Sequence, residues 1–157
     1  MNILVLCTGN SARSILLEAI LSQRSQGRIT AFSAGSHPAG RVHPQSVKLL
    51  DALGYATTAL RSKSWDDFGT PDAPVMDAVI TVCGSAAGET CPYWAGAPIR
   101  VHWGVDDPAA ALPADWDTAF QSAYDQLNAR AKALLALPFE TLDRTTLTKE
   151  MTRIGTL

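Results

Sequence analysis

The 157-residue sequence has few cysteines, no long apolar run and no cluster of basic residues. Its three cysteines, Cys7, Cys83 and Cys91, form an odd and sparse set, which argues against a structural disulfide framework. No apolar run approaches the roughly 18 residues that cross a bilayer. The run 3–6 is too short for the core of a signal peptide and has no basic flank. These absences predict a cytoplasmic protein with no membrane partner, whose cysteines are inert, bind a metal or carry out redox chemistry.

The charge balance is nearly even, with 13 basic and 15 acidic residues and a formal net charge of −2. Without a basic stripe, nothing favours binding to nucleic acid. Hydrophobic residues make up 46% of the chain and charged residues 18%, a composition typical of globular rather than disordered proteins. A chain of this length is close to the usual size of one domain.

Short apolar runs alternate with segments of helical periodicity along the chain. The pattern predicts strands at 2–6, 29–33, 77–82 and 99–102, and helices at 14–26, from Pro44 to before Gly54, from about 115 to 134 (capped by Asp115) and at 143–154. This alternation predicts an α/β fold with a parallel sheet. Ligands of such sheets bind beyond the carboxyl ends of the strands, where both Cys7 and Cys83 fall.

A loop from Cys7 to Arg13 joins the first strand to the first helix. A strand–loop–helix turn aims backbone N–H groups and the positive end of a helix dipole at one point, which suits a tetrahedral oxyanion. The planar guanidinium of Arg13 can hold two oxygens of such an anion. The residues expected to bind the oxyanion are Thr8, Gly9, Asn10, Ser11, Ala12, Arg13 and Ser14.

The same surroundings predict a lowered pKa for the Cys7 thiol, because helix N-termini and cations stabilise a thiolate. Ser14 could add a hydroxyl hydrogen bond to that thiolate. Asn10 suits a left-handed backbone position in the loop. The alternative is an inert, buried cysteine beside a tight turn, which would leave Arg13 without a reason to stand at a buried helix start.

The sequence resembles the low-molecular-weight protein tyrosine phosphatase superfamily and, within it, the arsenate reductases. The resemblance is carried by VLCTGNSARS, FSAGSHP, VITVC, ETCP and HWGVDDPA. It implies a four-stranded parallel sheet flanked by helices on both faces, with arsenate held in the loop and Cys7 as the nucleophile. It extends from residue 2 to about 137, so we expect one domain over 1–157 with a C-terminal extension from about residue 138.

Cys83 and Cys91 are separated by seven residues, which does not fit the short spacing of a zinc site, and no paired histidine follows. We therefore expect no metal and no cofactor. Each cysteine alone could be an inert residue. The resemblance implies instead that they are the resolving pair of a disulfide relay, in which Cys83 attacks Cys7 and Cys91 then attacks Cys83. Thioredoxin is the electron donor expected for three protein thiols. A glutaredoxin or a low-molecular-weight thiol is the alternative electron donor.

Asp107 precedes a proline in the loop after the fourth expected strand, where a fixed carboxyl group can act as general acid. The alternative is an acidic surface turn, and Asp106 is the expected bystander. Tyrosine phosphatases of this size commonly have tyrosine after Asp-Pro. Ala109 stands there in this chain and favours a small inorganic substrate.

Some arsenate reductases of this type bind potassium behind the loop, and Asn10, Glu18 and Ser33 match positions used there. The stretch 61–65 has serines where a carboxylate would be expected, so the sequence leaves open whether an ion binds there. The function expected overall is reduction of arsenate to arsenite. The alternatives are a low-molecular-weight protein tyrosine phosphatase and a non-enzymatic oxyanion sensor or redox-regulated binding module.

Overall fold

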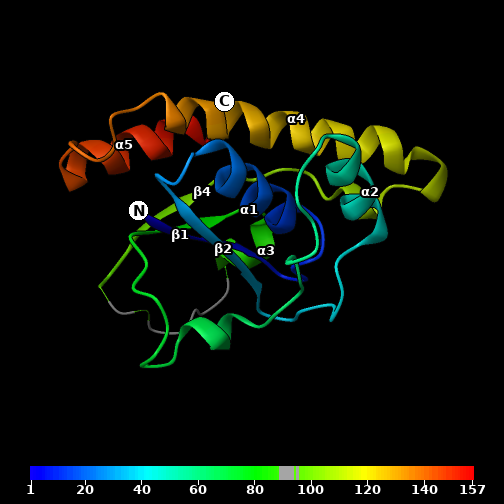
Figure 1. Cartoon of the computed structure of the whole chain (residues 1–157), viewed down its shortest axis with the longest axis horizontal. Coiled ribbons are helices and arrows are strands. Elements are labelled where there is room, and N and C mark those ends of the chain that lie inside the picture. Colours follow the sequence, from blue (N-terminus) through cyan, green and yellow to red (C-terminus); the bar gives the residue numbers. More distant parts are fainter. Residues whose placement is uncertain (89–93, 95) are drawn as a thin grey trace.

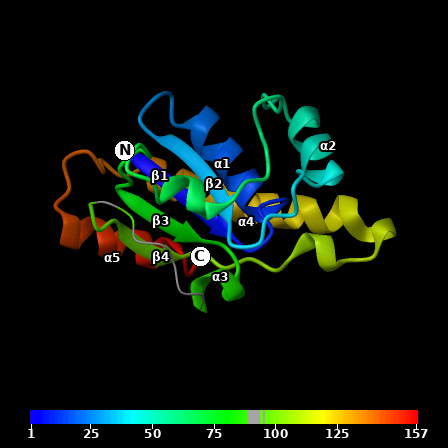
Figure 2. The same ribbon diagram turned by 90° about the horizontal axis from the view of Figure 1, so that it is seen from below.

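A four-stranded parallel sheet organises the computed structural model, which describes residues 1–88, 94 and 96–157. Its strands lie in the order β2-β1-β3-β4 (Figures 1 and 2). They are β1 (Asn2–Cys7), β2 (Thr30–Gly35), β3 (Ala78–Thr81) and β4 (Ile99–His102). This confirms the predicted α/β fold. It also makes β1 and β3 neighbours, so the two strands that end near Cys7 and Cys83 lie side by side.

Helices α1 (Arg13–Arg24) and α4 (Trp116–Leu135) pack against one face of the sheet, with α5 (Arg144–Ile154) next to β4 and α4 (Figure 1). Helix α2 (Pro44–Ala52) contacts α1 and α4. Ile3 and Val5 of β1 point into this core, since alternate residues of a strand face the same side. The apolar residues of α1 are buried as predicted: Ile15, Leu16, Leu17, Ala19, Ile20 and Leu21.

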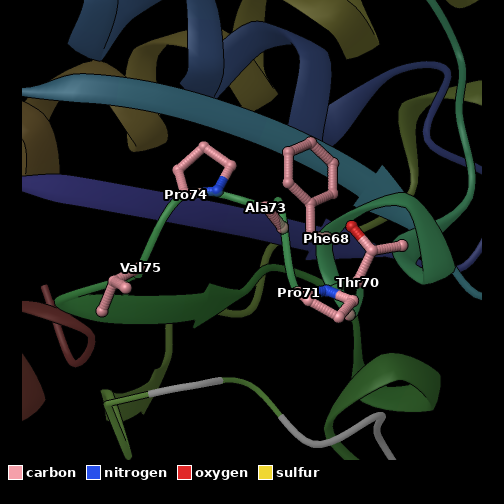
Figure 3. A pocket seen from close by; sticks show the side chains of 7 residues that line it. Phe68, Thr70, Pro71, Ala73, Pro74 and Val75 are labelled. Atoms are coloured by element: carbon pink, nitrogen blue, oxygen red, sulfur yellow. The ribbon is translucent and has the colours of Figure 1, made fainter.

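The other face of the sheet is covered by a short 3₁₀ helix, η1 (Trp65–Phe68), and the irregular chain around it. Leu4 and Leu6 of β1 pack there in one apolar cluster with Trp94. A hollow of about 250 Å³ opens between η1 and β3 (Figure 3). It is lined by Phe68, Gly69, Thr70, Pro71, Ala73, Pro74 and Val75. This lining offers one hydroxyl group and no charged side chain, so it lacks the groups needed for nucleophilic chemistry.

Local sequence signals account for most element ends. Gly54, after α2, has a φ of 85°, as its terminating position predicts. Asp143 caps α5 by accepting a hydrogen bond from the backbone N–H of Thr146 at 2.7 Å. The prediction for Asp115 was wrong in part. It is the N-cap residue of α4, but its side chain makes no capping hydrogen bond, because a 3₁₀ turn, η3 (Pro113–Asp115), leads directly into the helix.

The chain beyond residue 137 is tied to the rest of the fold by buried polar groups. The Trp103 indole N–H donates to the carbonyl oxygen of Met151 in α5 at 2.9 Å. Arg130 of α4 is almost fully buried and donates to the carbonyl oxygens of Gly104 and Leu157, at 3.0 Å each. These bonds connect α5 to the strand end that leads toward Asp107. None of the helices described is both long and apolar enough to cross a membrane.

Candidate active site

The loop between β1 and α1 forms a pocket of about 140 Å³ at the carboxyl edge of the sheet. The structure gathers seven of the predicted residues there, together with Asp107 and Ala109 from the loop after β4. The seven are Cys7, Thr8, Gly9, Asn10, Ser11, Ala12 and Arg13. Ser14 is fully buried one residue into α1. The structure therefore brings most of the predicted loop residues together around one pocket, and their binding of an oxyanion stays a prediction.

Two backbone features shape the loop. Asn10 has a φ of 47°, the left-handed conformation predicted for it. Gly35 of β2 lies so close behind the loop that a Cβ atom there would collide with the carbonyl oxygens of Thr8 and Cys7. Ala12 is the N-cap of α1 and has no side-chain acceptor, so the first N–H groups of the helix are left for an anion.

The Arg13 side chain is held over the pocket by the loop after β4. Its Nη1 donates to the carbonyl oxygen of Val105 at 2.9 Å, and its Nη2 lies 3.7 Å from Asp107 Oδ2. Its Nε is buried and has no hydrogen-bond partner among the described residues. A buried donor of this kind is costly to leave unsatisfied, and an oxyanion in the pocket would satisfy it.

The thiols of Cys7 and Cys83 are both buried and share a hydrogen bond. This hydrogen bond is the largest cause that lowers the pKa of Cys83, to about 5. The same bond, together with burial, raises the pKa of Cys7, although the nearby Arg13 acts in the opposite direction. The prediction of a lowered Cys7 pKa is therefore wrong for this arrangement. The two thiols therefore titrate as a pair, with the pKa of one raised and that of the other lowered.

The Cys83 thiolate has further donors around it. The backbone N–H of Ala86, in the short helix α3 (Gly84–Gly88), donates to its sulfur at 3.4 Å. The Thr8 hydroxyl lies 3.6 Å from the same sulfur. The predicted hydrogen bond from Ser14 to Cys7 is not found among the described residues. The Ser14 hydroxyl accepts a hydrogen bond from Asn10 Nδ2 at 2.8 Å. Cys91 lies outside the described residues.

Asp107 stands at the rim of the pocket. Its side chain is 44% exposed and accepts a hydrogen bond from the backbone N–H of Ala109 at 3.0 Å, at the start of the 3₁₀ turn η2 (Pro108–Ala110). This bond fixes the carboxyl group beside Arg13. Asp106 is exposed and does not line the pocket.

Sequence reasoning missed Lys63. The sequence pattern of residues 61–65 draws attention to a missing carboxylate, whereas the structure places the largely buried cation of Lys63 there. The Lys63 ammonium lies behind the loop, 3.3 Å from Ser33 Oγ and 4.0 Å from Glu18 Oε1. The sequence signal for this role is a lysine at position 63, within the stretch where a carboxylate ligand for potassium is expected. Across the described residues, no group of three His, Cys, Asp or Glu side chains could hold a metal ion.

The fold and the loop match one protein family. The model of the low molecular weight phosphotyrosine protein phosphatase family matches residues 2–151, and the chain belongs to this family. Its curated relatives include an arsenate reductase of Halalkalibacterium halodurans, 35% identical over 81% of this chain and 89% of the relative. Arsenate reductase 1 of Bacillus cereus is also 35% identical, over 81% and 88% of the two chains.

Solved structures agree with this assignment. An arsenate reductase in the phosphate binding state is 26% identical, covers 86% of this chain and 96% of its own, and superposes with a TM-score of 0.70. A low molecular weight protein tyrosine phosphatase from T. tengcongensis, 20% identical with a TM-score of 0.62, shares the fold.

Proposed function

We propose that this protein reduces arsenate to arsenite, with Cys7, Cys83 and Cys91 as a disulfide relay. The observation that carries the proposal is the hydrogen bond between the Cys7 and Cys83 thiols at the base of an oxyanion-sized pocket. A phosphatase needs the loop and one cysteine. A second thiolate beside the nucleophile is of use when the first sulfur must itself be attacked.

Arsenate binds to the backbone N–H groups of the loop and to Arg13, whose buried Nε has no other partner among the described residues. The proton shared by the two thiols passes from Cys7 to Cys83, and the positive charge of Arg13 favours the resulting Cys7 thiolate. The Cys7 sulfur attacks arsenic, a sulfur–arsenic bond forms, and a hydroxyl group leaves as water with a proton from Asp107.

The reduction occurs in the second step. Cys83 gives its proton to water, and its thiolate attacks the Cys7 sulfur. A Cys7–Cys83 disulfide forms, the sulfur–arsenic bond breaks, and its electron pair stays on arsenic, which leaves as arsenite. Cys91 then attacks Cys83, so that Cys7 is released as a thiolate and a Cys83–Cys91 disulfide remains.

This disulfide needs two electrons from outside the chain. We propose a cytoplasmic dithiol protein of the thioredoxin type as the donor, because a dithiol resolves the mixed disulfide intramolecularly. A solved thioredoxin-dependent arsenate reductase of Corynebacterium glutamicum shares the fold, with 22% identity and a TM-score of 0.62.

The test is mass-spectrometric disulfide mapping of the reduced protein after one equivalent of arsenate. The wild type should show Cys83–Cys91, and Cys91→Ser should stop at Cys7–Cys83. Cys83→Ser should release no arsenite. Hydrolysis of an aryl phosphate, which needs Cys7, Arg13 and Asp107 alone, should survive in both variants. If the wild-type thiols all stay reduced while aryl phosphate is hydrolysed rapidly, the protein is a phosphatase.

A further inference from the structure

A buried ion pair lies directly behind the anion-binding loop and takes no part in the chemistry described above. It joins Lys63 to Glu18 of α1. The backbone carbonyl oxygen of Lys63 accepts a hydrogen bond from the backbone N–H of Gly35 at 2.9 Å, which places Lys63 beside β2. The two side chains are 9% and 14% exposed, and Lys63 Nζ lies 4.0 Å from Glu18 Oε1. Burial raises the pKa of Glu18 and lowers that of Lys63, while each group's charge favours the ionised form of the other.

The Lys63 ammonium is surrounded by oxygen atoms. Besides Glu18, it donates to the carbonyl oxygen of Arg61 at 3.0 Å and to Ser33 Oγ at 3.3 Å. Ser33 in turn donates to Glu18 Oε2 at 2.6 Å. A carboxylate, a hydroxyl and a carbonyl oxygen around one positive charge form the kind of oxygen-lined site that suits a cation.

The pair is connected to the loop through Asn10. The side-chain amide of Asn10 donates to Ser33 Oγ at 3.0 Å and to Ser14 Oγ at 2.8 Å. Its Oδ1 accepts from the backbone N–H of Lys63 at 3.0 Å. Asn10 is fully buried and holds the left-handed backbone conformation that turns the loop. The ion pair is thus linked to the loop by the hydrogen bonds of Ser33 and Asn10.

We propose that Lys63 is a built-in cation that pairs with Glu18 and positions Asn10, so that the anion-binding loop is organised by an ammonium group and not by a bound monovalent metal ion. Lys63 and Glu18 are positioning residues, since neither lines the pocket. The consequence is that anion binding by this chain is independent of potassium. Removing the ammonium leaves a buried carboxylate among oxygen atoms, a site that a potassium ion can then occupy.

The experiment is calorimetric titration of the reduced full-length protein with inorganic phosphate, in buffers containing either potassium or tetramethylammonium as the cation. Phosphate binding needs an intact loop but no turnover. The result therefore tests the role of Lys63 whether or not the chain reduces arsenate. We expect the wild type to bind phosphate equally well in both buffers. Lys63→Ala should bind about 10-fold or more weakly in tetramethylammonium, the usual scale of coupling between sites, and should regain affinity in potassium.

Two further variants separate this role from a general loss of stability. Glu18→Gln combined with Lys63→Ala should lose the potassium effect, because the carboxylate that would hold the ion is gone. Lys132→Met, on the exposed side of α4, should behave as the wild type in both buffers. The proposal is overturned by a potassium dependence of the wild type, by Lys63→Ala binding phosphate as tightly as the wild type, or by an absence of potassium rescue in that variant.

Discussion

Arg13 and Asp107 meet at the rim of the anion pocket, with the Arg13 Nη2 atom 3.7 Å from Asp107 Oδ2. The carboxyl group is 44% exposed, so this pair contributes little to stability. Its position matters more than its energy. In the proposed mechanism, an oxyanion held by Arg13 would lie next to the Asp107 carboxyl group, within reach for proton transfer.

The first prediction concerns proton delivery by Asp107. Asp107→Asn should slow formation of the thiol–arsenate adduct by roughly 10²–10⁴, the usual contribution of general acid catalysis. Asp106→Asn should change the rate little, because Asp106 is exposed outside the pocket. Single-turnover measurements of the two variants give the comparison. A larger effect at Asp106 would assign the acid to that residue.

The second prediction concerns the shape of the Arg13 side chain. Arg13→Lys keeps the charge but loses the planar fork that reaches both Val105 and the anion. A lost charge-assisted hydrogen bond is worth about 1.5–3 kcal/mol, so phosphate should bind about 10- to 100-fold more weakly by calorimetry. Arg153→Lys, on the exposed side of α5, is the matched control. Unchanged phosphate affinity in Arg13→Lys would show that the guanidinium does not clamp the anion.

The third prediction follows the thiolate with pH. The pKa of Cys83 is lowered to about 5, so ultraviolet absorbance of the reduced wild type should show one thiolate appearing as the pH rises through about 5. Cys7→Ala removes the hydrogen-bond donor and should move this midpoint up, toward roughly 8.5. Because the Cys7 pKa is raised, no second thiolate from this pair should appear near neutral pH. A midpoint unaffected by Cys7→Ala would mean that the two thiols do not share a proton.

The fourth prediction concerns Arg130, which connects α4 to the strand end before the acid loop. Arg130→Met removes the donors to the Gly104 and Leu157 carbonyl oxygens. It should lower the free energy of unfolding by about 1–3 kcal/mol, the cost of leaving a buried polar group unpaired. Urea denaturation measures this change, with Arg153→Met as the exposed control. A loss no larger than that of the control would show that these bonds contribute nothing.

The strands and the loop could be predicted from sequence because their signals are local. Residues 3–6 are apolar on both faces, as a central parallel strand requires, and Asn10 is a residue type that tolerates a left-handed backbone. The cover over the second sheet face could not be predicted in the same way. Its apolar side chains come from η1 and distant loops, and they share no sequence period.

The charge state of the thiols and the place of Lys63 depend on tertiary pairing. Cys7 and Cys83 meet because β1 pairs with β3, and their hydrogen bond raises the pKa of Cys7 and lowers that of Cys83. Lys63 reaches Glu18 because a bridge between Gly35 and Ser64 lays residues 61–64 beside β2. Neither relationship is visible in residue spacing, so helix-terminus and loop arguments alone gave the wrong direction for the Cys7 pKa.

Gly35 carries a consequence for how this protein can vary. Its hydrogen atoms touch no substrate, yet any side chain there would strike the carbonyl oxygens of Thr8 and Cys7 and push the loop outward. In a library of variants selected for survival on arsenate, glycine should therefore be retained at this position, while the solvent-facing residues of α4 should accept many substitutions. Intolerance to substitution at Gly35 would then show that the shape of the loop depends on a residue without a functional group.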